Sequence, residues 1–333
     1  MASIRDVAKR AGVSIATVSY VLNGSRKVSP ELREAVLRAV EEMGYIPNAV
    51  AKSLREQRTR TLGIVVPDIG NPFFSALIQA FEACAREQGY RVIVASSEED
   101  GSLEEDALLN LTGRQVEGIA LVPTQDLHNP PSKQVPLVVL DRLSRSLDVD
   151  AVGVENEASA YLATRFLLEQ GHRRILVPAS DLRLTNIQER IQGYLRALEE
   201  RGLKADPSLL VECGRGPLEG VRRRIAEAIQ RLQPTAVFPI TNRLTLATLR
   251  AIRELGLRVP QDLSVIGFDD FEWSHLLDPP LTVVAQPVEA LGREACRILL
   301  QRVLGLSGQG VYQVRLPCTL EVRGSVGPPR RGA

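Results

Sequence analysis

Short apolar runs alternate with longer amphipathic segments along most of this chain, from Thr61 almost to its end. The runs are rich in leucine and β-branched residues, as expected of strands buried on both faces. They are residues 62–66, 91–95, 118–122, 137–140, 175–177, 236–238 and 263–266, and the helical patterns include residues 73–88, 158–170 and 244–255. This alternation predicts an α/β fold with doubly wound parallel sheets. The length requires two such sheets, and two facing sheets form a cleft with a hinge.

The composition bounds the class of protein. The chain has 333 residues, more than one typical domain, and its 44% hydrophobic and 24% charged content is ordinary for a globular protein. No apolar run approaches the ~20 residues that span a bilayer. Met1 leads directly into a helical pattern without a signal peptide. We therefore expect a cytoplasmic protein that does not bind membranes.

The four cysteines, Cys84, Cys213, Cys296 and Cys318, are scattered and form no paired-cysteine motif. Only three histidines accompany them as possible imidazole ligands. A zinc site or a disulfide framework is therefore not expected, and we predict no metal and no cofactor. We expect the cysteines to be small buried residues.

The first sixty residues carry a different pattern, in which two short helices meet at a tight turn. Gly12 permits the turn, and Ser14 is placed to cap the second helix. The third helix begins at Ser29-Pro30 and ends at Met43-Gly44. Ile4, Val7, Ala8 and Ala11 form the apolar face of the first helix, Val18, Val21 and Leu22 that of the second, and Ile15, Ala16, Thr17, Ser19 and Tyr20 remain exposed. A small amphipathic set of this kind suits the major groove of DNA.

Charge separates the same segment from the rest of the chain. Residues 1–60 contain 11 Lys or Arg against 6 Asp or Glu, whereas residues 61–333 contain 30 against 34. A basic excess confined to one module is the electrostatic footprint of a segment that neutralises phosphates. The alternative is a three-helix cap without a ligand, which the charge disfavours.

Several motifs, in a fixed order, resemble the lactose repressor/galactose repressor (LacI/GalR) family of bacterial transcription regulators. They are Ile4-Arg5-Asp6-Val7-Ala8, Ala11-Gly12-Val13-Ser14, Thr17-Val18-Ser19, Val21-Leu22-Asn23-Gly24, Gly44-Tyr45-Ile46-Pro47-Asn48, Gly63-Ile64-Val65-Val66-Pro67, Asn71-Pro72-Phe73-Phe74, Leu140-Asp141-Arg142, Gly171-His172-Arg173-Arg174-Ile175, Gly267-Phe268-Asp269-Asp270, Pro279-Pro280-Leu281-Thr282 and Gln286-Pro287. Each motif is weak alone, but their order and spacing together are specific.

The resemblance implies a small all-helical helix-turn-helix head and a two-subdomain core like that of periplasmic binding proteins. The expected boundaries are 1–47 for the head, 48–60 for a hinge helix and linker, 61–327 for the effector-binding core and 328–333 for a flexible tail. Within the core we expect an N-subdomain of about 61–153 and 288–315 and a C-subdomain of about 154–287 and 316–327. The function implied is a DNA-binding regulator, most often a repressor, of carbohydrate genes.

By the same resemblance, the head contacts operator DNA through a defined set of residues. Ile15, Ala16 and Tyr20 face bases, and Thr17, Ser19 and Asn23 face phosphates, with Ser3, Ile4, Ser14, Lys27 and Ser29 completing the contacts. Position 20 often carries arginine in the family, which reads guanine through two hydrogen bonds that tyrosine cannot make. We therefore expect a different base at the matching operator position. The alternative for Ile15 and Tyr20 is that they simply pack.

The segment from Asn48 to Arg55 has good helix formers but is too short to be stable alone, since isolated helices below ~12–15 residues are marginal. The resemblance implies that two copies meet in the minor groove of a pseudo-palindromic operator, contacting it through Asn48, Ala51, Leu54 and Arg55. Leu54 is then the wedge that unstacks a base step. This arrangement implies a homodimer, and an ordinary flexible linker is the alternative.

Matching family positions places the effector site at Asn71, Phe73, Phe74, Asp141, Arg190, Arg215, Thr241, Asn242 and Asp269. Carboxylates, an arginine and an aromatic wall suit a hydroxyl-rich ligand. Arg215 stands where relatives often have an aromatic residue, and Arg243 where they often have a carboxylate. These changes favour a sugar acid or sugar phosphate over a neutral sugar, unless both arginines are solvated surface residues.

Two other classes of function are disfavoured. An exported sugar-binding protein would lack the basic head and carry an export signal. An enzyme of sugar metabolism would need an acid, base or nucleophile constellation, and no nucleophile elbow or phosphate-binding lysine motif is present. Asp269 and Asp270 resemble a catalytic pair, but adjacent residues at a strand end point to opposite faces.

Overall fold

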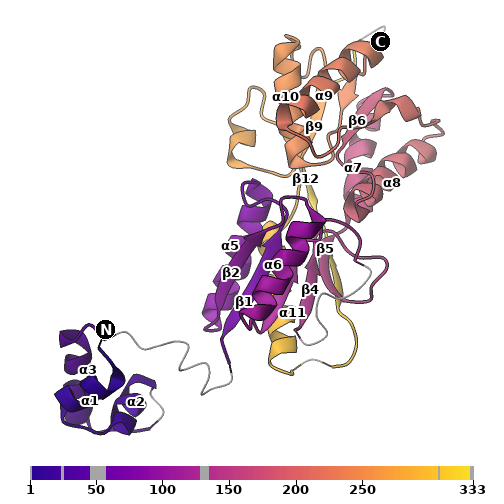
Figure 1. Cartoon of the computed structure of the whole chain (residues 1–333). Coiled ribbons are helices and arrows are strands. Elements are labelled where there is room, and N and C mark those ends of the chain that lie inside the picture. Colours follow the sequence, from indigo (N-terminus) through magenta and orange to yellow (C-terminus); the bar gives the residue numbers. More distant parts are fainter. Residues whose placement is uncertain (1, 24–25, 46–57, 128–134, 307, 331–333) are drawn as a thin grey trace. The chain divides into compact units, whose positions relative to one another are not determined.

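The computed structural model describes residues 2–23, 26–45, 58–127, 135–306 and 308–330. The chain divides into two compact units, Met1–Thr59 and Arg60–Ala333 (Figure 1). None of the helices in the described residues is both long enough and apolar enough to cross a membrane.

The first unit is a bundle of three short helices, α1 (Ile4–Ala11), α2 (Ile15–Asn23) and α3 (Pro30–Glu42). Gly12 ends α1 in the left-handed conformation at φ +67°, which a residue without a side chain adopts at little cost. The expected cap of α2 is present, since the Thr17 backbone N–H donates to Ser14 Oγ at 3.0 Å. The buried core consists of Val7, Ala8, Val18, Val21, Val36 and Ala39. The three helices predicted from the apolar spacing are therefore confirmed.

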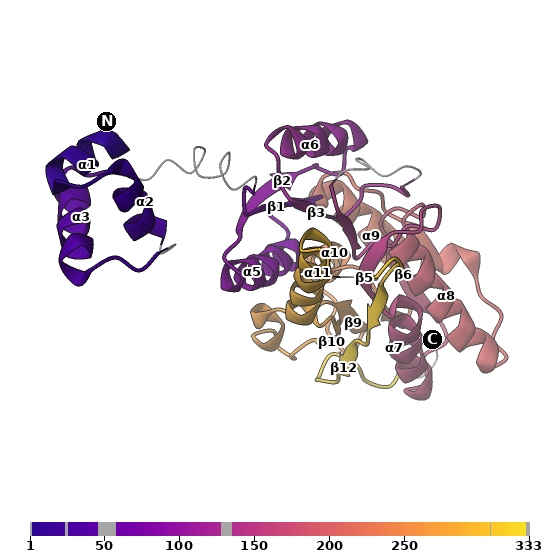
Figure 2. The ribbon, with the colours of Figure 1, turned by 90° about the horizontal axis from the view of Figure 1, so that it is seen from below.

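The second unit contains two six-stranded sheets. The first has the order β11-β5-β4-β3-β1-β2, and all of its neighbouring strands are parallel. Its strands are β1 (Thr61–Val66), β2 (Arg91–Ser96), β3 (Gly118–Leu121), β4 (Leu137–Leu140), β5 (Asp150–Val154) and β11 (Gln313–Leu316). Helix α6 (Gly101–Gly113) covers one face, and α5 (Pro72–Glu87) and α11 (Val288–Val303) cover the other (Figure 2).

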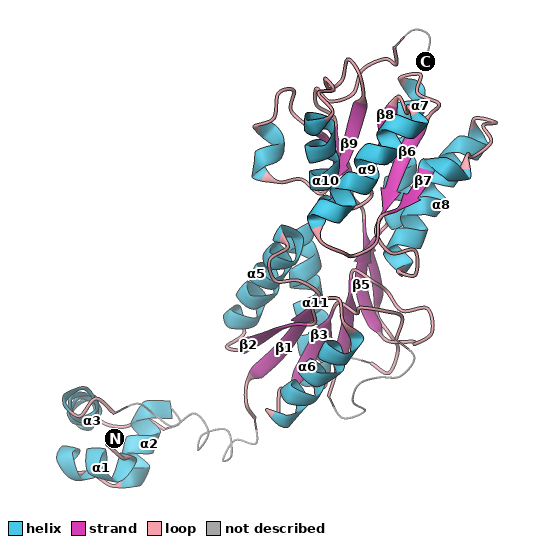
Figure 3. Ribbon diagram, turned by 45° about the horizontal axis from the view of Figure 1, so that its top comes forward, coloured by secondary structure: helices cyan, strands magenta, loops and turns pink. Residues whose placement is uncertain are grey.

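The second sheet has the order β12-β10-β9-β8-β6-β7. Its strands are β6 (Ile175–Ala179), β7 (Leu210–Glu212), β8 (Ala236–Val237), β9 (Ser264–Phe268), β10 (Thr282–Ala285) and β12 (Thr319–Glu321). Helices α7 (Asn156–Glu169) and α8 (Thr185–Glu200) pack on one face, and α9 (Leu218–Leu232) and α10 (Asn242–Glu254) on the other (Figure 3). Strand β12 runs antiparallel to β10, so the expectation of purely parallel sheets is wrong at this edge.

The chain passes between the two sheets three times. It leaves the first sheet after β5, returns after β10 and crosses again between β11 and β12, whose strands belong to different sheets (Figure 1). Two sheets joined in this way form two lobes within one unit, and the edges that carry the strand ends face each other.

The tail is shorter than expected. Residues 328–330 belong to the packed structure, because Arg330 pairs with Asp262 and donates from Nε to the Gln261 carbonyl at 3.1 Å. The remaining residues of the expected tail, 331–333, lie outside the described part of the chain.

The expectation of four buried cysteines is only half right. Cys213 and Cys296 are buried, whereas Cys84 and Cys318 are half-buried, and all four are free thiols.

Candidate functional site

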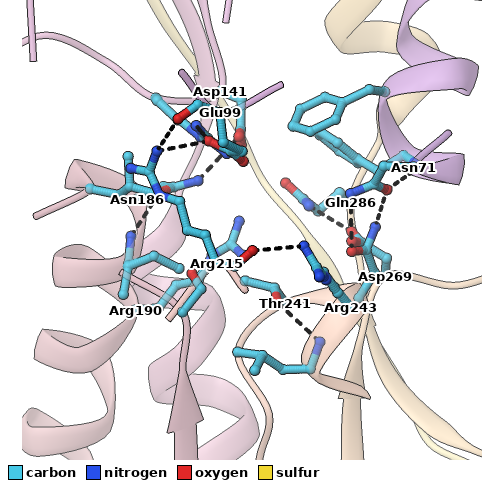
Figure 4. Close-up of a pocket in the computed structure, with 18 of the residues that line it drawn as sticks. Asn71, Glu99, Asp141, Asn186, Arg190, Arg215, Thr241, Arg243, Asp269 and Gln286 are labelled. Atoms are coloured by element: carbon cyan, nitrogen blue, oxygen red, sulfur yellow. Dashed lines mark hydrogen bonds and ion pairs between the residues drawn. The ribbon is translucent and has the colours of Figure 1, made fainter. Parts of the chain in front are cut away.

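A cavity of about 90 Å³ lies between the two lobes (Figure 4). Its polar residues follow strands of both sheets, which is where open parallel sheets bind ligands. All nine residues expected at an effector site line this cavity: Asn71, Phe73, Phe74, Asp141, Arg190, Arg215, Thr241, Asn242 and Asp269. The fold thus brings together side chains that are up to 198 positions apart in the sequence, from 71 to 269.

Two buried carboxylates face the cavity, one from each lobe. Asp141 follows β4 and Asp269 follows β9, and both hold a positive φ, +60° and +69° respectively. Asn186 donates to Asp141 Oδ2 at 3.1 Å, and Gln286 donates to Asp269 Oδ1 at 2.6 Å. A left-handed backbone is uncommon outside glycine and is found most often where function over-determines a position.

Burial raises the pKa of Asp269 to about 6, and the like charge of Asp141 adds to the rise. Arg190 and the Gln286 amide oppose it. Asp269 therefore changes its charge near neutral pH. Asp270 points away from the cavity and pairs with Arg323, so the two adjacent aspartates have separate surroundings, as their spacing predicts.

Arg190 supplies a fixed cation to the cavity. Its guanidinium carbon lies 3.7 Å from the ring centroid of Phe268, its Nε donates to Asn156 Oδ1 at 2.8 Å and its Nη1 donates to the Ile240 carbonyl at 2.7 Å. Stacking and hydrogen bonds hold the plane of the guanidinium in place. Burial lowers the pKa of Arg190, while the charges of Asp141 and Asp269 act against that effect.

A pair of carboxamides closes one side of the cavity across the lobes. Asn242 Nδ2 donates to Asn71 Oδ1 at 2.6 Å, and Asn71 Nδ2 donates back to Asn242 Oδ1 at 3.3 Å. Asn71 also caps α5, and Thr241 caps α10. Beside them, Phe73 and Phe74 meet edge to face with ring centroids 5.2 Å apart. This wall combines amide donors and acceptors with an apolar surface.

The arginine expected to attract an anion is already paired. Arg215 lies 3.0 Å from Glu99 Oε2 and 2.9 Å from Asp181 Oδ2, and it also donates to the Thr124 carbonyl at 2.8 Å. Arg142 holds the same Glu99 through two hydrogen bonds of 2.6 and 2.7 Å. Arg215 therefore lines the cavity as a paired cation and is not a solvated surface residue. Arg243 donates to the carbonyls of Arg215 and Gly216 and has no carboxylate partner among the described residues.

Five polar residues of the cavity were not predicted from the sequence: Glu99, Arg142, Ser180, Asn186 and Gln286. Arg142 and Gln286 belong to the motifs Leu140-Asp141-Arg142 and Gln286-Pro287, which are the sequence signal for them. Glu99 and Asn186 carry no local signal. They reach the cavity because of how the loop after β2 and the first turn of α8 are placed.

The three-helix unit presents its expected contact residues on the second helix. Ile15 is 44% exposed and Ala16 is exposed, whereas Thr17, Ser19 and Tyr20 are partly buried. Exposure of Ile15 argues against the alternative that it simply packs. Ser3, Ser14 and Ser29 cap the three helices, Ile4 packs on the core, and Lys27 is exposed. Asn23 ends α2, and its side chain lies outside the described part.

Tyr20 has a neighbour that the sequence did not indicate. The Arg26 guanidinium carbon lies 5.2 Å from the centre of the Tyr20 ring, which is the distance of a cation–π contact. This contact places a cation beside the tyrosine. The four hinge residues expected to contact DNA, Asn48, Ala51, Leu54 and Arg55, lie outside the described residues.

Comparison with known proteins agrees with this division of the chain. Residues 3–48 match the model for bacterial regulatory proteins of the lacI family, and residues 164–326 match the periplasmic binding protein-like domain. The ribose operon repressor of Haemophilus influenzae is 37% identical over 309 residues, which is 91% of this chain and 92% of that protein.

Two solved structures extend the comparison. A complex of the transcriptional regulator CelR with cellobiose is 33% identical, with a TM-score of 0.72, and the match covers 98% of this chain and 100% of that one. The lac repressor dimer bound to operator and the anti-inducer ONPF is 27% identical, with a TM-score of 0.85, over 98% and 99% of the two chains.

Proposed function

The chain belongs to the lacI family of bacterial regulatory proteins, and on this premise we propose that a small sugar in the cavity between the lobes controls its affinity for operator DNA. The chain is a DNA-binding transcriptional regulator and not an enzyme, in line with the repressors it resembles. Its place of action is the cytoplasm, where a bacterial chromosome lies.

We assign DNA contact to the three-helix head of residues 1–47 and to a hinge at 48–60, with residues 61–327 as the effector core. The exposed face of α2 supports the first assignment, and the basic excess of residues 1–60 supports both. A symmetric homodimer on a pseudo-palindromic operator follows, because one recognition helix covers only one half-site. The lac repressor dimer on its operator supports this arrangement by similarity.

The ligand class is argued from the cavity. Asp141, Asp269 and Asn186 provide acceptors and a donor at fixed positions, Arg190 provides a cation, and Phe73 and Phe74 provide an apolar wall. This convergence of charged groups and aromatic rings is the observation that carries the proposal, because paired hydroxyls satisfy charged groups while a ring covers the apolar face of a sugar. Gln286 Oε1, buried and without a partner among the described residues, offers one more acceptor to a hydroxyl.

A neutral sugar now fits better than an anionic one. Arg215 is paired with Glu99 and Asp181, and the charges of Asp141 and Asp269 act on Arg190. Arg243 also lines the cavity and has no carboxylate partner among the described residues, but its guanidinium donates to backbone carbonyls. A phosphate or carboxylate would meet Asp141 and Asp269 in the same small space, at a cost in repulsion. The size of the cavity favours a monosaccharide such as a pentose, which is also what the ribose operon repressor suggests by name.

Sugar binding would act on DNA through the orientation of the lobes. A change there alters the distance between the two hinge segments of a dimer, which fold only when held together on DNA. A coupling of about 1–3 kcal/mol between the cavity and the operator is typical of such systems. Because coupling is reciprocal, operator DNA changes the sugar affinity by the same factor.

The test is a titration of operator affinity, followed by fluorescence anisotropy, against D-ribose, D-ribose 5-phosphate and cellobiose. The operator fragments come from the region upstream of the protein's own gene. We expect a neutral sugar to shift the operator affinity and the phosphate to leave it unchanged. Arg190→Ala should abolish the response, and Asp269→Asn should shift it to higher sugar concentrations, while both variants keep the operator affinity measured without sugar. A wild-type response in both variants would place the ligand elsewhere.

A further inference from the structure

Two cysteines from distant parts of the chain meet on the back of the first lobe. Cys84 lies near the end of α5 and Cys296 lies in the middle of α11. The Cys84 thiol donates a hydrogen bond to the Arg293 carbonyl of α11 at 3.8 Å, which places its sulfur atom against the turn of α11 that precedes Cys296. Cys296 is fully buried, whereas Cys84 is half-buried and open to small molecules.

The packing of the two helices explains why the thiols are so close. A Cβ placed on Gly292 would lie 2.7 Å from both Ala80 Cβ and the Leu77 carbonyl, so α11 contacts α5 almost backbone to backbone at this point. Cys84 and Cys296 each follow one turn later, four residues after Ala80 and Gly292 respectively. Figure 2 shows α5 and α11 side by side. The small residues Ala80 and Gly292 let the helices approach closely, and this places the side chains of Cys84 and Cys296 beside each other one turn later.

We propose that Cys84 and Cys296 form a peroxide-sensitive thiol pair that closes to a disulfide between α5 and α11. Cys84 is the attacking thiol because it is the accessible member of the pair. Cys296 is the resolving thiol, because it lies one turn beyond the close contact of α11 with α5, as Cys84 does, and is shielded from solvent.

The charges around the pair favour this division of roles. The neighbouring Cys296 side chain lowers the pKa of Cys84 to about 7, assisted by Arg293 and Arg297, while burial and Glu87 oppose the change. The pKa of Cys296 is raised, by its contact with Cys84 and by burial. A thiolate at Cys84 beside a protonated thiol at Cys296 is the state from which oxidation proceeds.

The reaction takes two balanced steps. The Cys84 thiolate attacks one oxygen of hydrogen peroxide, so that an S–O bond forms, the O–O bond breaks and hydroxide leaves, which oxidises the sulfur to a sulfenic acid. The Cys296 sulfur then attacks the Cys84 sulfur, and the S–S bond forms. The departing hydroxide takes the Cys296 proton and leaves as water. A dithiol reductant reverses the disulfide.

The location gives the disulfide a consequence for the cavity. Helix α5 begins with Pro72, Phe73 and Phe74, and α11 begins just after Gln286, so both helices start at the cavity wall. Cys84 lies 11 residues from Phe73, about 16 Å along the helix. A covalent link between the helices would therefore restrain two walls of the cavity together.

The test exposes the reduced full-length protein to hydrogen peroxide and maps thiols by alkylation and peptide mass spectrometry. We expect a loss of two thiols per chain, a Cys84–Cys296 peptide and recovery with dithiothreitol. Cys296→Ser should stop the reaction at a sulfenic acid on Cys84 that dimedone traps, and Cys84→Ser should remain unmodified. Cys213→Ser and Cys318→Ser are matched controls that still form the disulfide.

Hydrogen exchange provides a readout that needs no ligand. In the oxidised protein, the backbone amides of residues 73–77 and 289–292 should exchange at least ~3-fold more slowly than in the reduced protein. The same treatment should leave their exchange unchanged in Cys84→Ser. Equal alkylation rates at Cys84 and Cys318, or peroxide treatment that leaves Cys84 and Cys296 unlinked, would overturn the thiol pair. Unchanged exchange at both helix starts would overturn its link to the cavity.

Discussion

At the scale of single residues, the cavity combines groups whose charge depends on their surroundings. Asp269 is the clearest case, because its carboxylate is buried in the presence of a second carboxylate and is stabilised only by Arg190 and the Gln286 amide. The same burial that makes ionisation costly makes each hydrogen bond to the ionised form strong. We therefore expect Asp269 to link ligand binding to pH.

We predict that sugar affinity increases with pH around neutrality. Since the pKa of Asp269 is raised to about 6, its carboxylate is mostly protonated at pH 5 and mostly ionised at pH 7. If the ligand hydroxyls need the ionised form, affinity rises about tenfold between these values. Calorimetric titrations across pH 5–8 check this. Asp270→Asn lies outside the cavity and should keep the pH dependence of sugar affinity, whereas Asp269→Asn should remove it. Sugar affinity that still varies with pH in Asp269→Asn would disprove Asp269 as the titrating group.

The same shift has the opposite sign for folding. A carboxyl whose pKa is higher in the folded state than in the unfolded one makes the folded protein relatively more stable below pH 4. That contribution disappears as pH rises from about 4 to 6. The buried carboxylate thus costs stability at the pH where we expect its ionised form to bind the ligand.

At the scale of elements, helix packing depends on a few positions without side chains. Gly193 in α8 faces α7, where a Cβ would meet the Glu157 carbonyl and lie 2.8 Å from Tyr161 N. Backbone cannot move aside as a side-chain tip does. The closest contact of these two helices is therefore possible only with glycine.

We predict opposite effects for two Gly→Ala changes. Gly193→Ala should destabilise the protein by about 2–4 kcal/mol, because α7 and α8 must separate. Gly220→Ala, in α9 with no atom within 4 Å of the added Cβ, should stabilise it by up to about 1 kcal/mol through helix propensity. Urea unfolding monitored by circular dichroism measures both. Equal changes in unfolding free energy would mean that α7 and α8 leave room for a side chain at position 193.

The bridge between Glu99 and Arg215 joins elements of different lobes. The side chains are 24% and 19% exposed, so solvent screens the pair only in part. We predict a coupling of about 0.5–1.5 kcal/mol in a double-mutant cycle of Glu99→Gln and Arg215→Gln, read from sugar affinity. Arg183→Gln is the control, because Arg183 shares Asp181 with Arg215 but stays within one lobe. A coupling energy of zero would mean that the Glu99–Arg215 ion pair does not contribute to sugar affinity.

The sequence predicted most of the elements with strong local patterns but missed two buried strands, β5 and β10, and elements that depend on distant partners. Strand β1 was found because its apolar run is continuous, whereas β7 and β12 are three residues long and only partly buried. The nine effector positions were reached through family resemblance. Glu99 was missed because its partner Arg215 lies 116 positions away, and no local pattern encodes the approach of two lobes.

At the scale of the whole molecule, the proposed dimer determines the form of the operator. Two heads joined through one symmetric assembly require half-sites on the same side of the duplex. We predict that inserting 5 bp between the half-sites, about half a helical turn, reduces affinity to that of nonspecific DNA. An insertion of 10 bp should restore part of the affinity if the linkers reach. Anisotropy titrations at fixed salt measure the difference, and equal binding to all spacings would indicate independent heads.

The three passages of the chain between the lobes have a mechanical consequence. Two bodies joined by one flexible segment rotate about it in any direction, whereas three separate connections restrict their relative rotation. We therefore expect molecules of different shape that enter between the bodies to produce motions within the same restricted range. Substitutions in the cavity then exchange one ligand for another without rebuilding the connections that carry the motion.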